Sequence, residues 1–82
     1  MSETAQQFLA RVERDAHRKH ERVGQHLFNE LWIKSSFVAG GLVHTTDDPF
    51  FLDYIPASTR DYVTRNWHMI EVEANRKRNE EL

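Results

Sequence analysis

The sequence contains no cysteine and only three glycines and two prolines in 82 residues. Without cysteine, neither a disulfide framework nor a thiolate metal site can form, and small secreted domains usually depend on such staples. The first residues lack the basic segment and apolar run of a secretion signal. No later apolar run approaches the roughly 20 residues that cross a bilayer. We therefore expect a cytoplasmic protein that does not span a membrane.

An excess of positive charge is also missing. Eleven Lys and Arg residues oppose thirteen Asp and Glu residues, so the net charge of −2 supplies no overall attraction for nucleic acid. Hydrophobic residues make up 39% of the chain and charged residues 29%, which favours a packed core with a well-solvated surface over disorder. A chain of this length has room for one core. We expect one helical domain over residues 1–82.

Apolar residues recur with a helical period through residues 4–34. Thr4 and Gln7 have the spacing of a capping box at the start of this helix. Its apolar stripe consists of Ala5, Phe8, Leu9, Val12, Ala16, Val23, Leu27 and Leu31. Gly24 interrupts the pattern at a cost of about 1 kcal/mol relative to alanine, so we expect Gly24 to pack closely against another backbone.

Two more helices and a loop complete the predicted fold. Ser35 and Ser36 can cap a short helix over about residues 36–43, although Gly40 and Gly41 weaken it. Residues 44–49 have the composition of a loop, and the aromatic residues after them return the chain to the core. A last helix is expected over about residues 58–77, followed by a frayed tail from about residue 78. The predicted class is all-α, with two long helices, a short helix and an ordered loop.

The middle of the chain carries a recognisable pattern. Residues 22–31 read Arg-Val-Gly-Gln-His-Leu-Phe-Asn-Glu-Leu, and residues 45–51 read Thr-Thr-Asp-Asp-Pro-Phe-Phe. This combination resembles a group of short, uncharacterised proteins common in bacteriophage genomes, with the pattern Gly-Gln-x-x-Phe-Asn-x-Leu, a small apolar helix and Thr-x-x-Asp-Pro-Phe. Several members have Pro and Gly where this chain has Ser36 and His44.

The resemblance covers roughly residues 22–53 and implies a helical phage protein with no assigned activity. It favours a host-directed or structural accessory role, located in the host cell cytoplasm. Gln25 and Asn29 lie four residues apart, and we expect their amides to bond the returning loop and so hold the fold together.

A metal site is the first chemical alternative. Glu13, His17, His20 and Glu21 are three or four residues apart on one side of the first helix. A single helix ridge rarely closes a tetrahedral site, and the chain has no His-Glu-x-x-His signature. We expect a solvated helix face with no metal, and the sequence leaves open whether His17 and His20 bind one.

Acid–base catalysis is the second alternative, since Asp47, Asp48 and Asp53 lie near His44 in a loop. Aspartates in turns usually bond the nearby backbone, and neither a nucleophile nor an oxyanion donor accompanies them. The sequence therefore predicts no enzyme, no catalytic residue and no cofactor.

Protein–protein association is the predicted function. An unbroken helix over residues 4–34 would be about 46 Å long, longer than a compact chain of this size is wide, so it either bends near Gly24 or projects its charged amino-terminal half. Its apolar stripe would then remain partly uncovered. The predicted partner-binding residues are Phe8, Val12, Arg14, Arg18, Lys19 and Arg22.

The predicted partners are a second copy of the chain, in a homodimer, and an unidentified bacterial host protein, for instance a defence or regulatory factor that the protein inhibits. The alternative is a nucleic-acid-associated regulator that uses the basic amino-terminal helix. Acidic residues interrupt that basic segment, and no known nucleic-acid-binding motif accompanies it.

Overall fold

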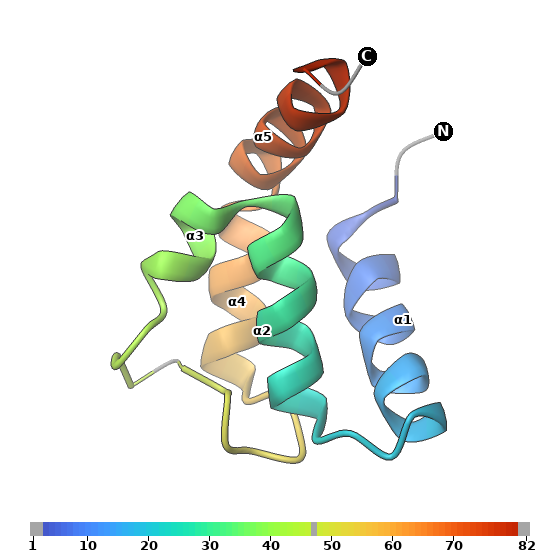
Figure 1. Ribbon diagram of the computed structural model, residues 1–82. Coiled ribbons are helices and arrows are strands. Elements are labelled where there is room, and N and C mark those ends of the chain that lie inside the picture. The colour runs from blue at the N-terminus through green and yellow to red at the C-terminus, as the bar shows by residue number, and fades with distance from the viewer. Residues whose placement is uncertain (1–2, 47, 81–82) are drawn as a thin grey trace.

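The computed structural model describes residues 3–46 and 48–80. Five helices and no strand occur in these ranges, which confirms the predicted all-α class. The helices are α1 (Ala5–Arg18), α2 (Val23–Lys34), α3 (Ser36–Gly40), α4 (Ala57–Arg65) and α5 (Trp67–Glu80). In Figure 1, α1 and α2 run side by side in opposite directions, while α5 continues from α4 past the end of the other helices.

The predicted helix over residues 4–34 is divided into α1 and α2 by a reversal of the chain at residues 19–22. α1 begins at the predicted capping box, in which the Gln7 amide donates to Thr4 Oγ1 over 3.1 Å. It ends where His20 takes a left-handed conformation with φ of 57°, and the Glu21 amide donates to the Ala16 carbonyl over 2.9 Å. This bond closes the C-terminus of a helix in the manner of a Schellman motif.

The reversal folds the apolar stripe of α1 into the core. All five helices contribute to a single cluster of buried residues, namely Phe8, Leu9, Val12, Leu27, Leu31, Val38, Ala39, Leu42, Ile55, Val63 and Ile70. The Phe8 ring lies 5.1 Å from that of Trp67, centroid to centroid. The prediction that this stripe stays uncovered is wrong, because Phe8 and Val12 are both 0% exposed within their own chain. Neither side chain can line a docking surface in this fold.

Gly24 lies against the backbone of the loop that precedes α4, as predicted. Its amide donates to the Leu52 carbonyl over 2.9 Å, and a Cβ atom at this position would lie 1.7 Å from the Pro49 carbonyl oxygen. One residue earlier, the Val23 amide donates to Asp53 Oδ1 over 3.2 Å. The start of α2 and the loop therefore meet through main-chain atoms and the Asp53 side chain. Asn29, whose amide was expected to bond this loop, is exposed.

The second half of the chain differs from the prediction in its details. Ser35 caps α3 as expected, since its hydroxyl accepts from the Val38 amide over 3.2 Å. α4 begins at Ala57, one residue before the predicted start of the last helix, and Pro56 precedes it without a side-chain cap. The predicted last helix is divided at Asn66, and its second part, α5, continues to Glu80, past the residue at which we expected fraying to start.

Candidate functional site

The predicted partner-binding residues separate into two groups. Phe8 and Val12 are in the core, whereas the basic residues are exposed. Those basic residues are Arg14 and Arg18 on α1, Lys19 in the turn after it, and Arg22 just before α2. The structure thus does not unite apolar and basic residues in the predicted surface.

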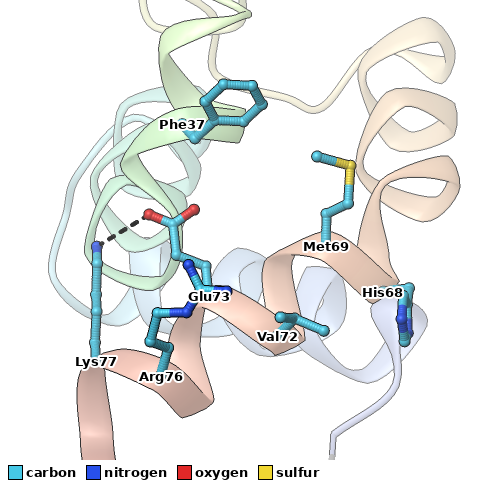
Figure 2. A pocket seen from close by; sticks show the side chains of 7 residues that line it. All are labelled: Phe37, His68, Met69, Val72, Glu73, Arg76 and Lys77. Carbon is cyan, nitrogen blue, oxygen red and sulfur yellow. Dashed lines mark ion pairs between the residues drawn. The ribbon is translucent and has the colours of Figure 1, made fainter. Parts of the chain in front are cut away.

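A groove lies between α3 and α5 and is lined mainly by apolar surface. Its volume is about 630 Å³, and it is lined by Phe37, His68, Met69, Val72, Glu73, Arg76 and Lys77. Phe37 is 73% exposed, Met69 48% and Val72 43%. In Figure 2, Phe37 and Met69 extend from facing elements toward one another. Large apolar side chains that gather at one exposed hollow are typical of an interaction site.

The wall of the groove is held by Glu73. Its carboxylate accepts from Ser35 Oγ over 2.5 Å and from Ser36 Oγ over 3.4 Å, and it lies 3.7 Å from Lys77 Nζ (Figure 2). The hydrogen bond from Ser35 is the main reason why the pKa of Glu73 is lower than its ordinary value. Desolvation acts in the opposite direction and raises it. Lys77 also donates to the Ile33 carbonyl over 3.3 Å. These contacts fix α5 against the junction of α2 and α3.

The remaining charge in the groove is positive. Glu73 and Lys77 balance each other, and Arg76 adds a second cation to the lining of the groove. Arg76 also lines a second hollow, together with Val72, Asn75 and Asn79. Because the two hollows share Val72 and Arg76, they form one continuous surface along α5.

Sequence reasoning missed this surface. Phe37 belongs to the predicted short helix, and the structure places it on the exposed side of α3, whose buried side is occupied by Val38 and Ala39. Met69 and Val72 lie outside the buried stripe of their helix. The sequence signal for this surface was the pair Met69 and Val72, two apolar residues three positions apart on the side of the helix that was expected to face solvent.

A second apolar surface is formed by aromatic rings. Phe28 stacks against Trp32 with ring centroids 5.9 Å apart and meets Phe50 edge-on at 5.7 Å. Phe50 in turn meets Phe51, which is 81% exposed and lies 5.8 Å from the Arg22 guanidinium. Sequence reasoning placed Phe51 in the core, and the structure instead leaves its ring on the surface beside a cation.

The residues considered for metal binding line a shallow polar hollow. Glu13, His17, His20 and Glu21 surround it with Asp53 and neighbouring residues. The Glu13 carboxylate binds the Arg60 guanidinium, and Glu21 Oε2 lies 3.4 Å from Nδ1 of His26. In residues 3–46 and 48–80, no group of three or more His, Asp or Glu side chains is arranged to hold a metal ion.

The loop considered for acid–base catalysis uses its aspartates for local bonding. Asp48 accepts from the His44 amide over 3.0 Å and from the Phe50 amide over 3.1 Å. Asp53 caps the start of α2. Asp47 lies outside the described residues. These bonds agree with the expectation that aspartates in this loop satisfy backbone groups.

The fold and the groove define an all-α domain with an uncovered apolar surface between α3 and α5. None of the helices in the described part of the chain is long and apolar enough to cross a membrane. Comparison of the chain with protein-family models, with curated proteins and with solved structures finds no match.

Proposed function

We propose that the protein acts by binding another protein through the α3–α5 groove and catalyses no reaction. The observation that supports this is the convergence of three exposed apolar side chains, Phe37, Met69 and Val72, from two elements on one hollow. Each Å² of such surface removed from water contributes about 25 cal/mol. A partner that covers the groove gains this energy, and the fixed α5 wall limits the entropy lost on binding.

The proposed partner is a bacterial host protein, for instance a defence or regulatory factor that the protein inhibits. The resemblance of residues 22–53 to small bacteriophage proteins supports this part of the proposal. The proposed contact surface changes from the first helix to the α3–α5 groove, since Phe8 and Val12 are buried. Figure 1 places the end of α1, which carries Arg18, at the opposite end of the molecule from α5.

Site-specific photo-crosslinking in bacterial cells tests the proposal. A photoreactive amino acid at position 69 is expected to give discrete adducts of higher mass, which are lost when Phe37→Ser is added. The same amino acid at position 54 is the matched control, because Tyr54 is also exposed but belongs to the loop before α4. Absence of any adduct from position 69, in protein whose helical circular dichroism is intact, would contradict the proposal.

A nucleic-acid-associated regulator remains the second candidate. The observation that favours it is the Arg22 guanidinium beside the exposed Phe51 ring, since aromatic rings next to cations can stack with bases. A mobility-shift assay at low salt, with single-stranded and duplex DNA, tests it. Binding that falls with salt and is weakened by Arg22→Gln supports this candidate, and no binding at low salt removes it.

A further inference from the structure

The α3–α5 groove has an apolar part and a cationic part. Phe37 of α3 and Met69 and Val72 of α5 form the apolar part, whereas Arg76 and Lys77 line the groove about one turn further along α5. Figure 2 shows Arg76 between Val72 and Lys77 on the α5 side, with Phe37 on the opposite side. The lining therefore changes from apolar to positively charged along the axis of α5.

Arg76 lies on the same face of α5 as the apolar side chains. At about 100° per residue, the exposed residues Met69, Val72 and Arg76 fall within about 60° of arc. They span about 10 Å along the helix axis. By the same count, Arg78 lies about 160° around the helix from Arg76. A segment that lies along Met69 and Val72 therefore meets Arg76 and does not meet Arg78.

The positive charge of the groove exceeds its negative charge. Among the described residues that line the groove, Glu73 supplies the one carboxylate. That carboxylate accepts hydrogen bonds from two serine hydroxyls at the α2–α3 junction and lies 3.7 Å from Lys77 Nζ. Arg76 and Lys77 together leave one net positive charge in the described lining, with histidine counted as neutral. Such a lining favours an occupant that brings a carboxylate and disfavours one that brings a cation.

The secondary structure around the groove favours a helix as its occupant. Extended peptides commonly bind by adding a strand to the edge of a sheet, and residues 3–46 and 48–80 contain helices and no strand. A helix bonds its own backbone groups and needs only an apolar face. The 10 Å of α5 that carries the groove matches about two turns, with anchors at i, i+3 and i+7. Figure 1 shows the C-terminal turns of α5 standing clear of the other helices.

From these observations we infer that the groove binds an amphipathic helix of the partner, in which an acidic side chain lies within about one turn of large apolar side chains. The apolar side chains pack against Phe37, Met69 and Val72, and the carboxylate pairs with Arg76. The inference rests on the proposed function, because it states the chemistry of the host segment that fills the groove. A second copy of α5 fits the groove less well, since its own groove face would add the two cations Arg76 and Lys77.

A pair of synthetic helical peptides tests the charge preference. Both peptides carry leucine at i, i+3 and i+7, and the turns on either side of the leucines carry glutamates in one peptide and lysines in the other. Binding is measured from the shift of the ¹³C-labelled Met69 methyl signal. The glutamate peptide is expected to bind at least about tenfold more tightly than the lysine peptide. Equal affinity, or a Met69 signal that neither peptide moves, overturns the inference.

Reversal of the charge at position 76 tests the proposed contact. Arg76→Glu is expected to reverse the preference, so that the lysine peptide binds more tightly. Arg78→Glu is the matched control, because Arg78 is also exposed on α5 but lies on the side away from the groove. It is expected to leave the preference for the glutamate peptide unchanged. A preference that survives Arg76→Glu, or that Arg78→Glu alters as much, overturns the inference.

Crosslinking from position 69 in bacterial cells separates the inference from the proposed function. Host-protein adducts that are lost in Arg76→Glu and kept in Arg78→Glu support both. Host-protein adducts that persist at wild-type yield in Arg76→Glu uphold the proposed function and overturn the acidic helix. Adducts that contain only the chain itself identify a second copy as the occupant and overturn the inference.

Discussion

Substitution of Gly24 by alanine tests the packing that fixes the start of α2 against the loop before α4. The new Cβ would lie 1.7 Å from the Pro49 carbonyl oxygen and 2.7 Å from that of Leu52. Both are backbone atoms, so no side-chain rotation relieves the overlap. The loop has to retreat by more than 1 Å, which breaks the hydrogen bond of 2.9 Å from the Gly24 amide to Leu52.

The expected loss of stability follows from three contributions. Overpacking costs about 1–3 kcal/mol and more where only backbone can move, the broken hydrogen bond costs about 1 kcal/mol, and the better helix propensity of alanine returns about 1 kcal/mol. We expect a net loss of about 3 kcal/mol. The total free energy of unfolding for a chain of this length is about 4–12 kcal/mol, so this is a large share of it.

Urea unfolding followed by circular dichroism measures the effect. At a slope of about 1–2 kcal/mol/M, the midpoint for Gly24→Ala is expected to fall by about 1.5–3 M. Gly40→Ala is the matched control, because a Cβ at that position would meet no atom within 4 Å apart from the adjoining backbone of its own helix. It is expected to be neutral or to stabilise by up to about 1 kcal/mol. The reasoning is refuted if both variants have the same midpoint.

Three further predictions concern the ends of helices and one carboxylate. His20→Gly is expected to raise the free energy of unfolding by about 0.5–1 kcal/mol, because glycine adopts the positive φ of 57° without strain; a lower thermal midpoint would contradict this. Ser35→Ala is expected to cost about 1–2 kcal/mol in urea unfolding, since it removes the α3 cap and a bond to Glu73, and an unchanged midpoint would count against it. The lowered pKa of Glu73 means that its contribution to stability is present above the ordinary value of 4.5 and is lost as the pH falls through the lower folded value. The urea midpoint of Glu73→Gln is therefore expected to fall less than that of the wild type between pH 6 and pH 3, and parallel curves would exclude this role.

Local patterns predicted much of the fold. The capping box of Thr4 and Gln7, the cap at Ser35 and the close backbone contact of Gly24 are all present. In each case the residue type itself indicates the local backbone structure, because hydroxyl side chains favour helix starts and glycine allows close contact between backbones. The helical period likewise identified the buried stripe that contains Phe8.

The reversal after α1 was not predictable from the same signals. A left-handed residue that ends a helix is usually glycine, and here it is His20. The apolar stripe continues in phase on both sides of the break, so the pattern favoured one long helix. The wrong prediction of the docking surface follows from this missed reversal. Because the chain turns back after α1, Phe8 and Val12 are buried in the core.

The groove could not be predicted from local sequence patterns, because it forms only in the tertiary structure. Phe37 and Met69 are far apart in the sequence, and only the packing of α5 beside α3 brings them together. Single exposed apolar residues such as Val72 are common on protein surfaces and indicate nothing alone. Their grouping carries the proposal, and the sequence does not encode it in any local pattern.

Occupation of the α3–α5 groove is the central claim, and methyl NMR tests it most directly. The sequence has two methionines, so a sample labelled with ¹³C at the methionine methyls gives one signal from Met69 and a reference signal from Met1. We predict that the Met69 signal shifts as bacterial extract is added, and that Val72→Glu abolishes the shift. A Met69 signal that stays at its original position in the extract would contradict the account.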